Sequence, residues 1–522
     1  MIIFSKGIKS MKNLFKVLVG AFFAFGAAYY ANTIAGNIPN SEFLVLATLF
    51  GAYMAMNIGA NDVANNVGPA VGAGALTIGG AIIIASIFEA SGSLIAGADV
   101  VGTIKKGIIS PTAFGNDPII FVYAMSAALL AAALWLNLAT WLKAPVSTTH
   151  SIVGGVMGAG IAAGGFAIVS WPTMGKIVAS WVISPILGGL IAAGFLYIIK
   201  SQILYKENKI AAAKKIVPIL VAIMSAAFIT YLTLKGLKHI WKDLTTALSF
   251  LPHTKKPTIG VGLTFGILGG VLTYFIVKPR VNAKIESLGD SREDLNKLFT
   301  IPLIFAAALL SFAHGANDVA NAVGPLAAVN DAITNLAISK KAAIPLWIMA
   351  VGGLGIAVGL TLFGPRLIKT VGSEITELDQ MRAFSIMMAA AITVIIASQL
   401  GLPVSSTHIA VGAVFGVGFL REWLDSKKMN EAQKQYLEEK EKLQAIKEAL
   451  KNCTNEDPTK KLELINQEKA QKKVVKKLKK AIRENYVKRG MVKKIVAAWI
   501  ITVPAAAVIS ALVFFVIKGM GA

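Results

Sequence analysis

Long apolar runs alternate with short polar stretches along almost the whole of this 522-residue chain. Each run is close to the roughly 20 residues that a helix needs to cross a lipid bilayer. We place the runs at 13–36, 42–58, 74–97, 119–142, 146–167, 176–200, 216–234, 259–277, 298–313, 343–364, 382–401, 403–420 and 492–517. A soluble protein would have no core large enough for so many buried helices. The pattern therefore predicts an all-α polytopic membrane protein with about 12 to 13 transmembrane helices.

The first apolar run allows two interpretations. Residues 1–41 begin with a basic stretch and continue into an apolar one, as a secretory signal peptide does. The apolar part is longer than the roughly 7–15 residues of a signal-peptide core. We therefore expect an additional, retained helix rather than a cleaved signal.

The second half of the chain repeats motifs of the first. "GANDVAN" at Gly59 returns at Gly315, 256 positions later. "APVSTTHSIVGGVMGAGI" at Ala144 returns as "LPVSSTHIAVGAVFGVGF" at Leu402, 258 positions later. Two blocks that keep their order and their spacing indicate a duplicated unit.

A third repeated block reveals one insertion. "KIVASWVIS" at Lys176 returns as "KIVAAWIIT" at Lys494, 318 positions later. The extra residues lie at 421–490, which hold 20 Lys or Arg and 12 Asp or Glu. Their charged, amphipathic pattern predicts a helical hairpin broken near "NEDP". The hairpin is either a regulatory or partner-binding element or a solvated hairpin that touches lipid headgroups, and we favour the second.

The insertion also predicts topology. Basic segments stay on the cytoplasmic side, whereas its counterpart in the first half, the turn at 164–175, carries no charge. Counterparts on opposite sides predict inverted-topology repeats, with broken helices and a shared substrate site near the midplane. The predicted units are 1–41 (extra helix), 42–200 (first repeat), 201–297 (connecting helices and loops without a counterpart in the repeats), 298–420 (second repeat), 421–490 (cytoplasmic insertion) and 491–522 (last helix, completing the second repeat).

The net charge of +23 does not indicate nucleic-acid binding. The basic residues lie between hydrophobic spans, as expected for cytoplasmic loops. The single cysteine, Cys453, excludes an internal disulfide and a cysteine metal cluster. Because no catalytic triad, P-loop or zinc motif is present, we expect neither an enzyme nor a cofactor, and no metal beyond a transported cation.

The two "GANDVAN" motifs place polar groups inside apolar surroundings. We expect Gly68 and Pro69 to interrupt the helix there, since irregular backbone at membrane depth is kept only where it lines protein or a wet cavity. Close helix packing would explain the glycines but not a carboxylate within a span. Asn and Asp oxygens are ligands that Na⁺ accepts. The predicted cation ligands are Asn61, Asp62, Asn65, Asn317, Asp318 and Asn321.

The "PVSTTH" and "PVSSTH" motifs predict an anion site. Proline suits the first turn of a helix, so we expect Pro145 and Pro403 there. The hydroxyls that follow would join free backbone N–H groups at the positive end of the helix dipole. Any single hydroxyl could instead bond its own helix. The predicted oxyanion-binding residues are Ser147, Thr148, Thr149, Ser405, Ser406 and Thr407, together with Asp62 and Asp318.

Other polar residues carry less specific signals. Glu89 lies inside an apolar span, where it either tunes the site or pairs with a neighbour. Histidines adjoin the motifs without metal-ligand spacing, so we expect hydrogen-bonded helix residues at His150, His314 and His408. Basic residues that follow spans are expected to reach the membrane interface rather than to draw anions; these are Lys105, Lys106, Arg366 and Lys369.

These paired motifs resemble those of the inorganic phosphate transporter (PiT) family, as do "SIFEASGSLIAGADVVGTIKKGI" and "FGPRLIKTVGSEIT". The resemblance covers 42–200, 298–420 and the last span. It implies cation-coupled phosphate uptake, with the Asn, Asp, Ser and Thr residues above sharing phosphate and cation binding. Glu89 matches a family glutamate, but Met387 stands where several relatives carry a second one. This departure weakens a carboxylate proton relay and favours sodium.

The sequence thus predicts a Na⁺-coupled symporter of inorganic phosphate in the cell membrane, working by alternating access. An H⁺-coupled phosphate permease and a sulfate permease remain alternatives. An anion channel and a receptor that acts through the insertion are alternatives of other classes. The sequence leaves a homodimer open as an assembly.

Overall fold

The computed structural model describes residues 2–110, 114, 118–142, 146–238, 240–335, 344–374, 378–426, 431–452, 458–484 and 489–521. The first half contains α1 (Ile2–Ala35), α2 (Ser41–Asn61), α3 (Val63–Gly72), α4 (Ile78–Ala96), α5 (Ala98–Lys106), α6 (Pro118–Trp141), α7 (Thr148–Gly164) and α8 (Trp171–Ile199). The connecting part contains α9 (Lys209–Gly236), α10 (Trp241–Ala247), α11 (Ile259–Glu286) and α12 (Arg292–Lys297). The second half contains α13 (Thr300–Asp318), α14 (Ala320–Asn335), α15 (Leu346–Glu374), α16 (Gln380–Gln399), α17 (Ser406–Ser426), α18 (Glu431–Asn452), α19 (Pro458–Glu484) and α20 (Arg489–Gly521).

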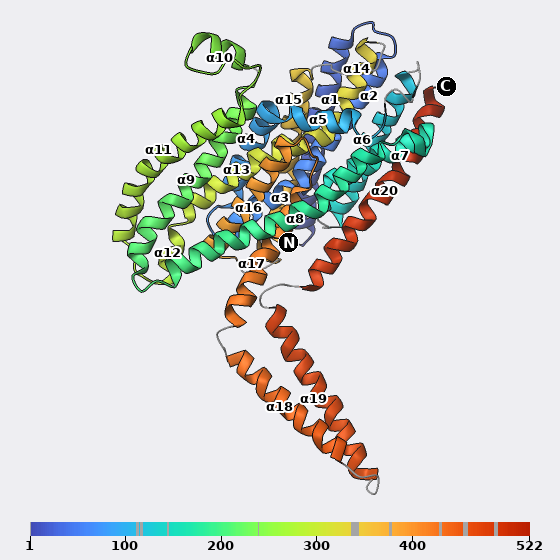
Figure 1. Ribbon diagram of the computed structural model, residues 1–522. Helices are drawn as coiled ribbons and strands as arrows, with labels where there is room; N and C mark the ends of the chain where they lie inside the picture. The colour runs from blue at the N-terminus through green and yellow to red at the C-terminus, as the bar shows by residue number, and fades with distance from the viewer. Residues whose placement is uncertain are drawn as a thin grey trace.

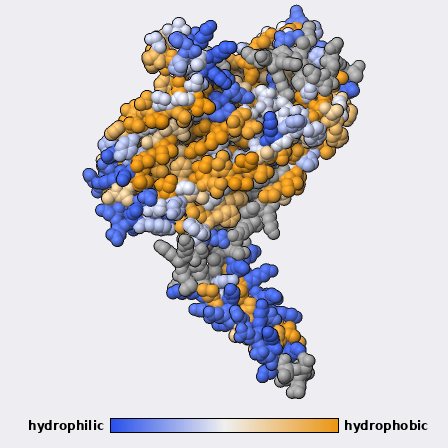
Figure 2. Space-filling view, viewed as in Figure 1, coloured by the Kyte–Doolittle hydropathy of each residue, from blue (hydrophilic) through white to orange (hydrophobic). Residues whose placement is uncertain are grey.

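The described residues form an all-α membrane fold, as predicted. Eleven of their helical segments are long and apolar enough to cross a membrane. Hydrophobic side chains cover the visible flank of the helical body, and polar ones gather at its ends (Figure 2). Two of the predicted runs, 146–167 and 403–420, form α7 and α17 and are not among the eleven. Helix α7 has 17 residues, and α17 carries Arg421, Glu422 and Asp425 toward its end, so neither offers a complete apolar span.

Helices of each half pack on helices of the other half, and the pairs come in matching sets. Helix α2 packs on α15 while its counterpart α13 packs on α4, and α7 packs on α20 while its counterpart α17 packs on α8. Glycines make these contacts close. A Cβ atom at Gly59 would lie 1.9 Å from the Ile356 carbonyl oxygen, and one at Gly315 would lie 2.2 Å from the Glu89 carbonyl oxygen. Each helix of these pairs therefore finds its backbone partner in the other half.

The connecting part is built mainly from α9 and α11, which pack on each other. Helix α9 also makes smaller contacts with α4, α13 and α16 of the two halves. That the segment at 201–297 has no counterpart in the repeats stays a prediction.

The charged insertion forms two helices, α18 and α19, that pack on each other and extend away from the helical body (Figure 1). Gln471 of α19 donates hydrogen bonds to the backbone oxygen of Glu439 (2.9 Å) and to its carboxylate (2.6 Å). This agrees with the helical hairpin that the sequence predicts. The expected break near "NEDP" lies outside the described residues.

Candidate functional site

The two Asn-Asp motifs lie in the interior at local irregularities of their helices. Asp62 lies between α2 and α3, and Val319 lies between α13 and α14. Both residues keep right-handed helical dihedral angles, and their N–H groups bond to the Ile58 and Gly315 carbonyl oxygens. The expected interruption at Gly68 and Pro69 is wrong, because Pro69 lies within α3 and the helix continues to Gly72. A proline removes only its own backbone hydrogen bond, so a helix can continue past it. In the first motif the irregularity instead falls at Asp62, a residue that is 1% exposed.

The Ser-Thr motifs open α7 and α17, as predicted, but with serine rather than proline at the boundary. Ser147 accepts a hydrogen bond from the His150 backbone N–H (3.1 Å), and Ser405 accepts one from the His408 backbone N–H (3.3 Å). A serine hydroxyl satisfies one of the free N–H groups of a first turn, which makes it the preferred cap. Pro403 therefore lies before α17 and not in its first turn. The same expectation for Pro145 lies outside the described residues.

The centre of the cluster brings residues of both halves together. Thr148 Oγ1 lies 2.6 Å from Asp62 Oδ2 and 3.2 Å from Asp318 Oδ2. Thr407 Oγ1 lies 3.1 Å from Asp62 Oδ1. All of these side chains are buried. Because a hydroxyl carries a single hydrogen, Thr148 can donate to only one of the two carboxylates at a time.

Asparagine amides connect the halves across this centre. Asn65 Nδ2 donates to Thr407 Oγ1 at 2.9 Å. Its counterpart Asn321 donates to Thr149 Oγ1 at 3.1 Å and to Thr148 Oγ1 at 3.2 Å. Thr149 is the counterpart of Thr407, 258 positions earlier. Each half thus supplies an amide to a hydroxyl of the other half.

The remaining two predicted asparagines make different contacts. Asn317 Nδ2 donates to Ser398 Oγ (3.0 Å) and to the Leu402 carbonyl oxygen (3.1 Å). Its oxygen accepts from the Val404 backbone N–H at 3.3 Å. Asn61 lies 2.9 Å from Thr140 Oγ1, and the amide orientation that satisfies both of its polar atoms lets it donate to Asp62 Oδ1 at 3.3 Å. Asn317 therefore holds the chain before α17, whereas Asn61 reaches the centre.

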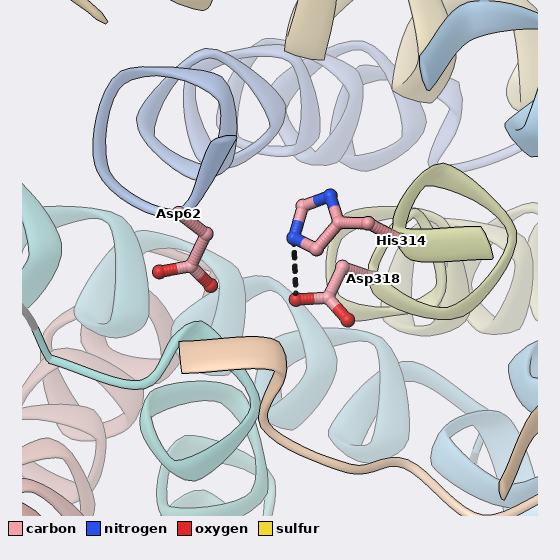
Figure 3. Close-up of side chains that lie close together, drawn as sticks. All are labelled: Asp62, His314 and Asp318. Atoms are coloured by element: carbon pink, nitrogen blue, oxygen red, sulfur yellow. Dashed lines mark ion pairs between the residues drawn. The ribbon is translucent and has the colours of Figure 1, made fainter. Parts of the chain in front are cut away.

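A buried chain of titratable groups adjoins the two aspartates. His314 Nδ1 lies 2.7 Å from Glu89 Oε2, and His314 Nε2 lies 3.1 Å from Asp318 Oδ2. Asn66 Nδ2 donates to Glu89 Oε1 at 2.8 Å. One ligand atom from each of Asp62, His314 and Asp318 lies within 4.8 Å of the other two, and Figure 3 shows Asp62 facing this pair from a separate helix.

The sequence did not place His314 in the cluster. It predicted a hydrogen-bonded helix histidine, which is correct, but not that its partners are the carboxylates of the site. The sequence signal that could have indicated this contact is the i,i+4 spacing of His314 and Asp318, which puts both side chains on one face of α13. His150 and His408 lie together instead, 4.4 Å apart between ring centres, and His150 stacks on Trp181.

Lys105 corrects another expectation. It does not reach the membrane interface but is 4% exposed, and its Nζ lies 3.0 Å from Asp331 Oδ2 of α14. A buried ammonium requires a paired charge, and Asp331 supplies one. Arg366 and Lys369 are exposed, as expected for residues at a span end. The side chain of Lys106 lies outside the described set.

Many apolar spans surround this buried cluster of carboxylates, hydroxyls and amides, which both halves build. Ionisable groups inside a membrane domain mark pathways for solutes or ions, and midplane sites between repeated halves are typical of secondary transporters. Fold and site together define a polytopic membrane transport protein.

Comparison with known proteins narrows this class. Residues 58–510 match the model of a family described as the phosphate transporter family. A Helicobacter pylori protein named "Putative phosphate permease" is 49% identical over 98% of this chain and 97% of its own length. A Pyrococcus horikoshii protein of similar name is 40% identical over 74% of this chain and 90% of its own. The chain belongs to the phosphate transporter family, which comprises permeases and not enzymes.

A solved structure agrees with this assignment. The chain is similar to the structure of a protein described as "The sodium-dependent phosphate transporter", with a TM-score of 0.72 and 33% sequence identity. The match covers 91% of this chain and 99% of that one. The family resemblance drawn from the sequence motifs is thereby confirmed.

Proposed function

We propose that the protein is a symporter that couples uptake of inorganic phosphate across the cell membrane to Na⁺. The observation that carries this proposal is the pair of buried aspartates from opposite halves, both within hydrogen-bonding distance of Thr148. Two carboxylates taken out of water cost several kcal/mol each unless positive charge offsets them. Bound cations would supply that charge and would let a phosphate anion join them.

Atoms around the centre fit such a role. The buried oxygens that make no hydrogen bond within the described part of the chain include Asp318 Oδ1 and Asn321 Oδ1, and Ser406 Oγ at the start of α17. Buried oxygens without a donor are costly, and Na⁺ accepts carboxylate, amide and hydroxyl oxygens as ligands. The proposed cation ligands are Asn61, Asp62, Asn65, Asn317, Asp318 and Asn321. Asn317 belongs to this set through its motif, although its amide is engaged with the chain before α17.

Phosphate would bind at the openings of α7 and α17. Free backbone N–H groups and the positive end of each helix dipole favour an anion there. The proposed phosphate-binding residues are Ser147, Thr148, Thr149, Ser405, Ser406 and Thr407, together with Asp62 and Asp318. The carboxylates would repel the anion by themselves, so occupancy requires anion and cations together, which is the physical basis of coupling.

Alternating access would use the exchanged packing of the two halves. Helix pairs such as α2 with α15 and α13 with α4 are related by exchange of the halves, a relation that inverted repeats would also produce. One group of helices would move against the other around the shared site. A homodimer stays a prediction. Similarity to a solved sodium-dependent phosphate transporter supports sodium as the coupling ion.

The test is uptake of labelled phosphate into proteoliposomes, with external Na⁺ replaced by choline at two pH values. Wild-type uptake should require Na⁺, and Asp62→Asn should abolish it while the protein remains folded. Asp243→Asn, the same chemical change at an exposed position of α10, is the matched control. Undiminished Na⁺-driven uptake by Asp62→Asn would contradict the proposal. Competition by unlabelled sulfate tests the anion, and conductance independent of a cation gradient would indicate a channel.

Proton coupling is a second candidate because of one observation. Glu89, His314 and Asp318 form a continuous buried chain of titratable groups that ends at the site. Such chains carry protons in many membrane transporters. In this case uptake would persist in choline, would grow with an inward proton gradient, and would disappear in Glu89→Gln.

A further inference from the structure

A cleft of about 700 Å³ lies beside the Asp62 half of the site, among α1, α2, α6 and α15. Its deep wall includes Asn57, Ala60 and Thr140. Asn57 and Ala60 are buried, and Thr140 is half-buried and contacts Asn61, the neighbour of Asp62 in the chain. The cleft therefore reaches a residue that contacts Asn61, directly beside the central carboxylate Asp62.

The cleft is lined mostly by apolar residues, but four polar or basic side chains also line it: Asn13, Lys16, Asn137 and Arg366. Asn13, Asn137 and Arg366 are exposed, and Lys16 is half-buried. Polar and charged side chains within a membrane domain normally face water-filled space, because placing them in lipid is costly. The chain begins, with α1, at the end of the body from which the charged hairpin of α18 and α19 extends (Figure 1), and its excess of basic residues assigns that hairpin to the cytoplasm. The mouth of the cleft, beside Lys16 of α1, therefore lies on the cytoplasmic side.

The corresponding place in the other half is filled. Ser398, the counterpart of Thr140, has its backbone oxygen 3.4 Å from Lys235 Nζ of α9. The same lysine pairs with Asp99 of α5. Tyr231 of α9 stacks edge-on against Phe312 of α13, with ring centres 6.1 Å apart. The Asp62 half of the site thus adjoins a cleft, whereas the Asp318 half lies beneath packed side chains and an ion pair.

We propose that this cleft is the aqueous path by which the oxyanion passes between the cytoplasm and the site, and that Lys16 binds the anion transiently at its mouth. The inference rests on the proposed transport function. It identifies the described conformation as one open toward the cytoplasm and closed, by the α9 and α5 contacts, on the opposite side. It also gives α1 a role, since α1 forms one wall of the path.

Cysteine accessibility tests whether the cleft holds water. Cys453→Ser removes the only cysteine of the chain, and single cysteines are then placed at Asn57 and, as a second position, at Asn137. Ala313, the buried counterpart of Asn57, and Phe22, which is 82% exposed on α1, serve as controls. Inside-out membrane vesicles are treated with a membrane-impermeant anionic methanethiosulfonate.

Asn57→Cys and Asn137→Cys should lose their free thiol, and phosphate with Na⁺ should slow the loss at Asn57→Cys. Ala313→Cys and Phe22→Cys should keep theirs, because one is packed and the other faces lipid. A maleimide added after denaturation shows that each variant carries a titratable thiol. Retention of the thiol by both Asn57→Cys and Asn137→Cys would mean that lipid fills the cleft and would overturn the proposal.

The role of Lys16 is tested by transport with phosphate supplied on the cytoplasmic face, in inside-out membrane vesicles. Lys16→Gln should raise the phosphate concentration for half-maximal transport from that face by about 10-fold at low ionic strength, as expected when charge steers an anion. Choline chloride at constant Na⁺ should shrink the difference by screening, and Lys16→Arg should behave as wild type. Wild-type kinetics of Lys16→Gln would show that Lys16 does not bind the anion at the mouth of the cleft. If the wild type carries no phosphate, the proposed function fails, while the thiol pattern still decides whether the cleft is aqueous.

Discussion

At the scale of residues, Thr148 is the group that joins the two halves. Its hydroxyl lies between Asp62 and Asp318 and receives the Asn321 amide at 3.2 Å. A carboxylate oxygen that lacks a donor in the interior loses its solvation without compensation. The single hydroxyl hydrogen cannot serve both aspartates at once, and besides it Thr407 lies beside Asp62 alone and His314 beside Asp318 alone, so the two carboxylates share few donors. This shortage is what a bound cation would correct.

Thr148→Val should abolish Na⁺-driven phosphate uptake, because valine fills the same space but offers neither donor nor acceptor to the aspartates. Loss of the hydrogen bond should also cost about 1–3 kcal/mol of stability. Thr148→Ser keeps the hydroxyl and should retain most of the uptake. The readouts are proteoliposome uptake and the melting temperature in detergent. Full uptake by Thr148→Val would contradict the role of the hydroxyl.

At the scale of elements, backbone contact between halves sets the helix positions. A Cβ atom at Gly416 of α17 would lie 2.0 Å from the Gly189 carbonyl oxygen of α8, and one at Gly158 of α7 would lie 2.2 Å from the Ala507 carbonyl oxygen of α20. Gly158 and Gly416 are counterparts, 258 positions apart. Small residues at membrane helix contacts let backbones approach closely. The helices that carry the Ser-Thr motifs are therefore anchored in equivalent ways.

Gly416→Ala should destabilise the protein by about 1–3 kcal/mol, because the added methyl group meets backbone that cannot give way. Gly194→Ala in α8, where nothing lies within 4 Å of the added carbon, is the control and should leave the melting temperature unchanged. Heating in detergent followed by size-exclusion chromatography measures both. A melting temperature of Gly416→Ala equal to that of wild type would contradict the close packing.

At the scale of the whole molecule, the two repeated halves differ in two respects. Helix α1 borders a cleft beside the Asp62 half of the site, whereas α9 covers the other half with Tyr231 and Lys235. The hairpin of α18 and α19 belongs to the second half alone and extends away from the body (Figure 1). The site contacts described above involve no residue of this hairpin.

Replacing residues 427–488 by a flexible Gly-Ser linker should therefore leave Na⁺-driven uptake intact. Uptake by the shortened protein is compared with that of the full chain, and Asp62→Asn in the shortened protein gives the background. Loss of uptake by a shortened protein that still elutes as a single species would instead assign the hairpin a regulatory or receptor role.

The sequence by itself determined the membrane class, the repeated motifs and the two clusters of polar residues. These are local properties: an apolar run long enough to span a bilayer must be helical there, because its backbone has no other partner. Repetition of "GANDVAN" and "PVS(S/T)TH" likewise indicated that Asp62 and Asp318 play equivalent parts. The serine caps followed the same local logic, although the sequence interpretation had assigned the boundary to proline.

Only the tertiary structure decided which groups meet. Glu89 and His314 are 225 positions apart in the chain, and Lys105 and Asp331 carry no motif that links them. The packing of α9 beside Ser398 and Phe312 likewise left no motif in the sequence. Contacts between distant segments depend on how helices from both halves approach, and a linear pattern contains that information only where a motif repeats.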